Sequence, residues 1–117
     1  MRPHLDVAAS ARRFAALGDP TRLQVFLQLA REPRSVADIA GAVHVSRPAV
    51  SQHLRVLTDA GLVEHEPAGT RHVYRPRADG VASLRDFLDG MWDVGLARFK
   101  AAAEAAARRL ARQESSA

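Results

Sequence analysis

The sequence contains no cysteine, and that absence excludes disulfides, thiolate metal sites and thiol redox switches. It also lacks the continuous apolar run of a signal peptide and any stretch long enough to span a bilayer. Nucleophile motifs built on serine or cysteine, a glycine-rich phosphate loop and a pair of catalytic carboxylates are missing as well. We therefore expect a cytoplasmic protein that is not an enzyme, needs no cofactor and binds no membrane.

What the chain does have is basic charge, carried almost entirely by arginine. Its 117 residues bear a net charge of +4, and 47% of them are hydrophobic. That length predicts one domain, and the many alanines predict a thin core, which favours a dimer. Arginine suits phosphates and guanine because its planar guanidinium can donate two parallel hydrogen bonds. An arginine-rich genome would give the same composition, so the charge permits nucleic-acid binding without requiring it.

Residues 46–57 form the stretch around which the rest of the chain is organised. At helical spacing Val50, Leu54 and Leu57 share one face, which requires a core. The opposite face has hydrogen-bonding side chains and no acid, as expected of a helix that reads base edges and contacts phosphates. We predict a DNA-recognition helix, with His53 on its flank as half-buried packing that also reaches a phosphate. Its DNA-binding residues are Ser46, Arg47, Ser51, Gln52, His53 and Arg55.

A short helix and a tight turn precede this stretch. Ser35 caps the helix, and Asp38 follows three residues later in a capping-box-like arrangement. Ala40 is small where two helices must cross, so residues 35–57 are typical of a helix-turn-helix. The turn has His44 where glycine is usual, and histidine tolerates a positive φ better than most residues, at some cost.

The N-terminal part of the chain predicts two more helices. Apolar residues recur at helical spacing over 6–17, and Gly18 is a natural end for that helix. Asp19 and Pro20 are a typical cap and first residue for a second helix, which Glu32 and the proline after it bring to an end. Residues 1–5 are expected to be a loose arm.

Residues 62–76, directly after the recognition helix, predict a β-hairpin. Gly61 ends the helix, residues 62–67 and 72–76 read as strands, and a turn joins them. A hairpin in this place is a wing, and Arg71 is positioned to reach a minor groove or a phosphate, with a solvated turn cation as the alternative. His65 and His72 could approach each other diagonally, although structural metal sites normally have four ligands.

A long helix over 79–112 is predicted to follow, with residues 113–117 frayed. Gly90 and Gly95 interrupt its apolar stripe, which argues against one straight rod. A helix this apolar in a small chain needs a partner, so we expect it to pair with the 6–17 helix and with the same elements of a second subunit. The predicted dimer contacts are Phe14, Leu84, Phe87, Leu88, Met91, Trp92 and Phe99.

The predicted fold is thus mainly α with a β-hairpin wing, namely four helices, two strands and a last helix in one winged helix-turn-helix domain over 1–117. Four motifs resemble the ArsR/SmtB family of bacterial repressors in order and spacing: Phe14–Leu23, Val45–Leu57, Ala60–Val63 and Gly69–Tyr74. The resemblance implies a homodimer that pairs through its first and last helices. It also implies binding to an imperfect inverted repeat in double-stranded operator DNA, often the protein's own.

The family's metal sites have no counterpart in this sequence. One family site uses cysteines before the recognition helix, where residues 34–39 hold no thiol, and another uses histidine from the last helix, where none occurs. Asp86, Asp89 and Asp93 line one face of that helix, a row more typical of a solvated surface than of a site for a hard cation. The chain is therefore expected to belong to a branch without metal ligands.

Three functions are open to a chain with these features. A dimeric repressor would block polymerase sterically, although the residues do not separate repressor from activator. A metal- or ligand-gated sensor would need a non-standard site, such as an effector pocket lined by Phe87, Met91 and Trp92, for which dimer core is the simpler role. A winged helix used only for protein contacts would need an apolar or acidic recognition face, which this sequence lacks.

Overall fold

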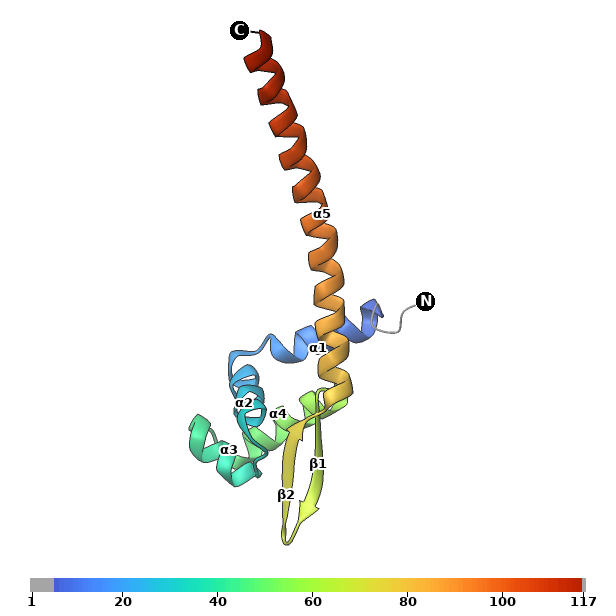
Figure 1. Cartoon of the computed structure of the whole chain (residues 1–117). Helices are drawn as coiled ribbons and strands as arrows, with labels where there is room; N and C mark the ends of the chain where they lie inside the picture. Colours follow the sequence, from blue (N-terminus) through green and yellow to red (C-terminus); the bar gives the residue numbers. More distant parts are fainter. Residues whose placement is uncertain (1–5, 117) are drawn as a thin grey trace.

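The structure is a computed structural model that describes residues 6–116, so the predicted arm at 1–5 lies outside the described residues. The elements are α1 (Val7–Leu17), α2 (Pro20–Arg31), α3 (Val36–Val43), α4 (Arg47–Asp59), β1 (Val63–Ala68), β2 (Arg71–Pro76) and α5 (Ala78–Ser116). Figure 1 shows α1 to α4 and the hairpin forming a lobe from which α5 projects as a long stem. The predicted order of four helices, two strands and a last helix is confirmed.

Short polar side chains fix where the helices begin. The Asp19 carboxylate accepts a hydrogen bond from the Arg22 N–H at 2.9 Å, and Pro20 follows as the first residue of α2. At α3, the Asp38 N–H donates to Ser35 Oγ at 3.2 Å while the Ser35 N–H donates to Asp38 Oδ2 at 3.5 Å. These are the two bonds of a capping box, so both predicted caps are confirmed.

The turn between α3 and α4 contains the strained residue that the sequence suggested. His44 has φ 60° and ψ 44°, in the left-handed region that glycine adopts most easily. The N–H groups of His44 and Val45 both donate to the Ala40 carbonyl, at 3.0 and 3.4 Å. This turn sets the direction in which α4 leaves α3.

The end of α4 reverses the chain within three residues. Ala60 is the C-cap, so Gly61, predicted as the cap, lies one position further on and has φ 77°. The Leu62 N–H donates to the Leu57 carbonyl at 3.0 Å and the Gly61 N–H donates to the Thr58 carbonyl at 2.9 Å, which is a Schellman motif. The reversal brings Leu62 into the core.

A single hydrophobic core joins the helices of the lobe to the hairpin. The apolar face predicted for the recognition helix is fully buried there, and each of α2 and α3 contributes its own apolar stripe. The buried hydrophobic residues are Ala16, Val25, Leu29, Ile39, Val50, Leu54, Leu57, Leu62, Val63 and Leu84. Leu84 is only 8% exposed, so it packs in its own subunit and is removed from the surface predicted for dimer contacts.

The hairpin is antiparallel, with His65 opposite Tyr74 and Pro67 opposite His72. A contact that the sequence did not predict ties β2 to the loop between α2 and α3. The Arg34 N–H donates to the Tyr74 carbonyl at 3.0 Å, and the Tyr74 N–H donates to the Arg34 carbonyl at 2.8 Å. The wing is therefore attached to the helix-turn-helix through its backbone.

α5 is one continuous helix of 39 residues, and two expectations about it are corrected. Gly90 and Gly95 do not interrupt it, because each costs a helix only about 1 kcal/mol relative to alanine. Residues 113–116, predicted to fray, are helical. The molecule consequently measures 78 Å along its longest axis. Among the described residues, no helix combines the length and apolarity needed to cross a bilayer.

Candidate nucleic-acid interface

α4 presents the side chains predicted to bind DNA on the face opposite its core contacts. Arg47, Ser51, Gln52 and Arg55 are exposed, whereas His53 is half-buried on the flank, as expected. The Ser46 hydroxyl accepts a hydrogen bond from the Ala49 N–H at 3.3 Å, so this side chain also serves as the helix cap. The arrangement leaves two long cations, an amide and a hydroxyl pointing away from the protein.

Two hollows flank this face, and each combines residues from α4 with residues from the wing. The first, of ≈ 320 Å³, brings two of the predicted DNA-binding residues, Arg47 and Arg71, together with His72, beside the N-terminus of α3. The second, of ≈ 370 Å³, is bordered by Ser51 and Arg55 on one side and by His65 on the other. Tyr74 borders both hollows. The wing and the recognition helix therefore form one surface.

His65, His72 and Tyr74 face the recognition helix, a placement that the sequence did not predict. Alternation along the two strands, with His65 opposite Tyr74, puts all three on the same face of the hairpin. That alternation was visible in the sequence, but which face turns towards α4 depends on how the hairpin packs. The same face brings His65 Nδ1 within 3.1 Å of His72 Nδ1, so the predicted diagonal approach is confirmed.

The wing arginines differ in how fully their charge is compensated. On the opposite face of the hairpin, Arg75 donates to Glu64 at 3.1 Å and to Glu66 at 2.6 Å. These hydrogen bonds, first from Glu64 and then from Glu66, hold the pKa of Arg75 above its usual value. Arg71 has a weaker contact, 4.0 Å from the Asp38 carboxylate, with both side chains mostly exposed. Arg71 is thus the wing arginine more readily released to a phosphate.

Asp38 makes closer contacts in the capping box with Ser35 than in its ion pair with Arg71. Its pKa lies below the usual value mainly because Ser35 donates side-chain and backbone hydrogen bonds, with smaller contributions from Arg71 and Arg34. The capping hydrogen bonds therefore lower the pKa of this carboxyl more than the nearby Arg71 does.

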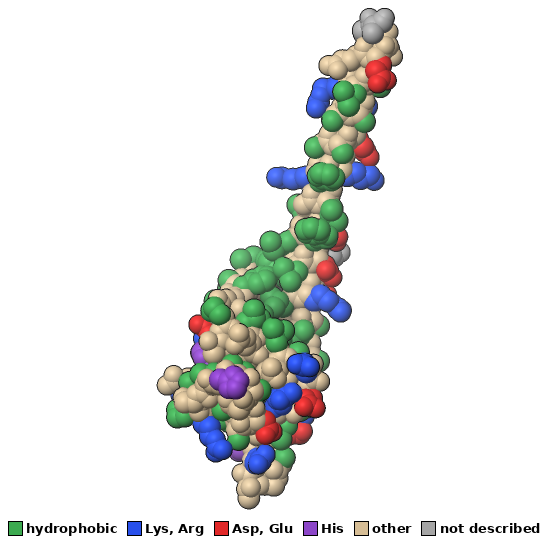
Figure 2. All heavy atoms as spheres, turned by 90° about the vertical axis from the view of Figure 1, so that its left-hand side faces the viewer, with side chains coloured by type: hydrophobic (Ala, Val, Ile, Leu, Met, Phe, Trp, Pro, Cys, Tyr) green, Lys and Arg blue, Asp and Glu red, His purple; other side chains and the backbone are tan. Residues whose placement is uncertain are grey.

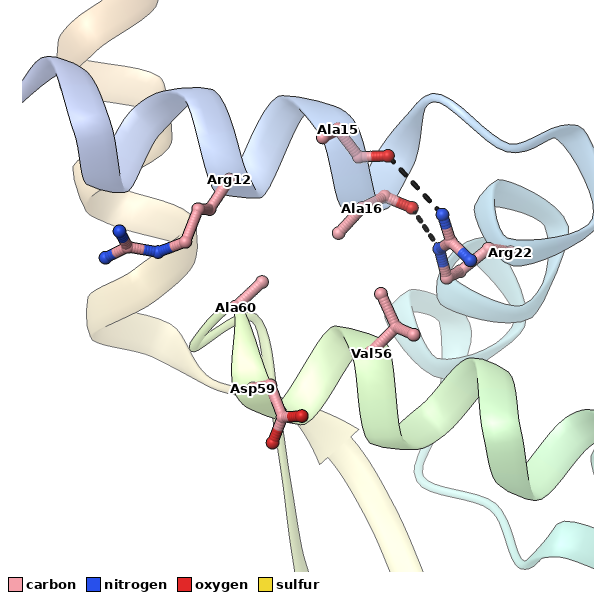
Figure 3. Close-up of a pocket in the computed structure, with 7 residues that line it drawn as sticks. All are labelled: Arg12, Ala15, Ala16, Arg22, Val56, Asp59 and Ala60. Carbon is pink, nitrogen blue, oxygen red and sulfur yellow. Dashed lines mark hydrogen bonds between the residues drawn. The ribbon is translucent and has the colours of Figure 1, made fainter.

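A third hollow, of ≈ 310 Å³, lies between α1, the start of α2 and the C-terminal half of α4 (Figure 3). Arg22 crosses one end of it and donates to the carbonyls of Ala15 and Ala16, which holds α2 to the end of α1. Phe87, Met91 and Trp92, which the sequence offers as the lining of an effector pocket, do not line this hollow. Instead Phe87 packs edge-on against Phe14, with ring centroids 6.0 Å apart.

Asp86, Asp89 and Asp93 form the acidic row on α5. Among the residues that the structure describes, no three or more histidine, cysteine, aspartate or glutamate side chains lie close enough together to hold a metal ion. Asp89 and Asp93 are exposed on the stem, and Asp86 is half-buried with an interaction of its own. The row therefore has the geometry of a helix surface.

A helix-turn-helix packed on the core through its apolar faces, an exposed basic and polar recognition face and an adjoining hairpin define a winged helix-turn-helix DNA-binding protein. Residues 19–65 match the family described as bacterial regulatory protein, arsR family. The chain belongs to this ArsR/SmtB family and is a DNA-binding transcriptional regulator.

Particular relatives show how far the similarity extends. The HTH-type transcriptional regulator Rv2034 of Mycobacterium tuberculosis is 48% identical over 85 residues, which are 73% of this chain and 79% of the relative. The transcriptional repressor SmtB of the same species is 42% identical over 74 residues, 63% of this chain and 53% of SmtB, so the chain spans about half of that protein. A homodimeric winged helix-turn-helix DNA-binding domain, Mb0332 of Mycobacterium bovis, superposes with a TM-score of 0.62 at 34% identity, covering 74% and 81% of the two chains.

Proposed function

We propose that this regulator acts as a homodimeric repressor that binds an inverted-repeat operator in the cytoplasm. The observation that carries the proposal is the continuous surface of α4 and the wing, where residues distant in sequence meet around two hollows. In this arrangement α4 enters a major groove while the wing contacts the flanking backbone. Bound protein then excludes polymerase sterically.

Base reading and backbone contact are divided among the exposed residues of this surface. Gln52 is suited to adenine, because its amide can both accept from N6 and donate to N7, and Arg55 or Arg47 is suited to guanine. Arg71, on the wing, adds a phosphate contact that fixes the position of the protein without reading sequence. Ser46, Ser51 and His53 complete the proposed contact set.

The second subunit is proposed to cover the apolar side of α5. Trp92 is 68% exposed and Phe99 is 72% exposed, and Leu88 and Met91 lie between them and the lobe. Figure 2 shows hydrophobic side chains gathered where the lobe meets the stem and continuing along the stem. Isolated exposed apolar residues are ordinary, but a contiguous set containing a tryptophan and a phenylalanine marks an interaction surface. The Phe14–Phe87 contact joins α1 to the same region.

Footprinting on the DNA upstream of the protein's own gene tests the operator, and two variants test the division of labour. Gln52→Ala is expected to relax sequence choice, with about 1–3 kcal/mol of discrimination lost at one position of each half-site. Arg71→Ala is expected to weaken binding to every sequence and to lower the salt slope by about 1 for each subunit.

Arg108→Ala is the matched control for charge, because Arg108 is exposed near the far end of α5, away from the wing. It removes the same net charge but should leave both specificity and salt slope close to the wild-type values. If Gln52→Ala and Arg71→Ala both retained wild-type operator affinity, these two assignments would be wrong.

A further inference from the structure

His65 and His72 form a side-chain pair that neither the fold nor the proposed DNA contacts require. They lie on neighbouring strands, two residue pairs apart in the register, with Nδ1 atoms 3.1 Å apart and ring centroids 5.1 Å apart. Both side chains are exposed, so an ion from solution can reach them. In the neutral pair one ring donates its Nδ1–H to the Nδ1 lone pair of the other.

The spacing of these nitrogens matches two neighbouring ligands of a transition metal. Two imidazole nitrogens about 2.05 Å from one ion and 3.1 Å from each other subtend an angle of ~98° at that ion. This angle falls between the right angle of square-planar or octahedral coordination and the tetrahedral angle. The ring that carries its proton on Nδ1 has only to move it to Nε2, so both lone pairs can bind the metal without loss of a proton from the protein.

The surroundings limit which ion fits and how completely it is held. No third histidine or carboxylate completes a cluster among the described residues, so water fills the remaining coordination positions. Arg55 and Asp59 border the hollow beside His65, while Arg47 and Arg71 border the one beside His72. Glu64 and Glu66 are on the opposite face of the hairpin and are bonded to Arg75. Two imidazoles favour Cu²⁺ over Ni²⁺ and Zn²⁺, and they disfavour Mg²⁺ and Ca²⁺.

We propose that His65 and His72 are a two-histidine chelating site on the wing for a divalent transition-metal ion, at one ion per chain. The ion sits between the two hollows of the recognition surface and adds positive charge where the proposed function places DNA phosphates. Resting on that function, the proposal predicts that the ion tightens DNA binding, because each added charge near the backbone increases counterion release.

Metal binding is measured first without DNA, so that its result does not depend on the operator. The wild-type protein is titrated with CuCl₂, NiCl₂ and ZnCl₂ by calorimetry, and the Cu²⁺ form is examined by electron paramagnetic resonance. We expect one ion per chain, tightest for Cu²⁺, with hyperfine coupling to two imidazole nitrogens. His65→Gln and His72→Gln are each expected to lower the affinity at least ~10-fold.

His44→Asn is the matched control, because it removes an exposed imidazole from the turn between α3 and α4 and asparagine tolerates the left-handed conformation. It should bind the ion as the wild type does. Equal affinity in the double variant His65→Gln/His72→Gln would place the ion elsewhere and overturn the proposal.

The coupling to DNA is tested separately, by operator titrations with and without one equivalent of Ni²⁺. A several-fold increase in affinity that disappears in the double variant is expected. If the ion binds the pair but the operator affinity does not change, the metal site stands and its effect on DNA binding is refuted. If no operator is found, the metal titration still decides the site.

Discussion

Replacing Gly80 with alanine should destabilise the protein by disturbing the base of α5. Gly80 lies against the reversal at the end of α4, and a Cβ built on it would be 1.8 Å from the Gly61 carbonyl oxygen and 2.8 Å from its carbon. Real Cβ atoms essentially never approach closer than 3.0 Å, so the two backbones must separate by at least 3.0 − 1.8 = 1.2 Å. No side-chain rotation can relieve this contact, because the carbonyl oxygen and carbon of Gly61 belong to the backbone.

The magnitude follows from two opposing effects. Overpacking of a close contact usually costs about 1–3 kcal/mol, and a backbone-to-backbone clash belongs at the upper end of that range or above it. Alanine in a helix recovers about 1 kcal/mol relative to glycine. We expect a net loss of about 2 kcal/mol in the free energy of unfolding, and a fall of roughly 8 °C in Tm for a domain of this size.

Urea and thermal unfolding at fixed protein concentration measure this loss, because unfolding of a dimer depends on concentration. Gly41→Ala is the matched control, since a Cβ at Gly41 in α3 would meet nothing within 4 Å. That variant should gain about 0.5–1 kcal/mol. If Gly80→Ala unfolded at the same urea concentration as the wild type, the close packing of α5 against the end of α4 would be wrong.

Three further predictions concern the local structures that hold the recognition helix. His44→Gly should stabilise the protein by about 0.5–1 kcal/mol in urea unfolding, because glycine adopts φ 60° without steric cost; a loss of stability would contradict the strain assigned to this turn. Ser35→Ala should cost about 1 kcal/mol in the same assay, since it removes one bond of the capping box, and an unchanged midpoint would argue against that cap. The pKa values of Asp19 and Asp38 are lowered in the folded protein, first by hydrogen bonds from Arg22 and Ser35 respectively. Their stabilisation is therefore complete above the unfolded value of 3.8 and is lost as the pH falls through the lower folded values, so the urea midpoint should stay level from pH 6 to 5 and drop below about pH 4.

The features predicted correctly from the sequence depend on neighbours a few residues away. The cap at Asp19 and the box at Ser35 act over three residues, so the residue types alone place the starts of α2 and α3. The buried face of α4 follows from helical spacing, and the positive φ of His44 follows from its place in a turn where glycine is usual.

The features that were missed depend on contacts between distant segments. Nothing near Arg34 in the sequence indicates that its backbone pairs with Tyr74. Leu84 has the same spacing as the exposed residues of α5, and only the packing of the first turns of that helix on the lobe buries it. The hollow that Arg47 and Arg71 both border arises from the same long-range packing, so the sequence alone predicted a DNA contact for each arginine but not that the two share one hollow.

The length of α5 turns small movements at its base into large ones at its end. Its 39 residues extend about 58 Å at 1.5 Å per residue, and the close contact of Gly80 with Gly61 lies at one end of that length. A tilt of only ~5° about this contact would displace the far end by about 5 Å over such a helix. The stem is thus a lever whose fulcrum is the chain reversal between the recognition helix and the wing. A molecule bound at the far end of α5 would apply its force about 58 Å from this contact, so a small force there would be enough to change the angle between the stem and the lobe.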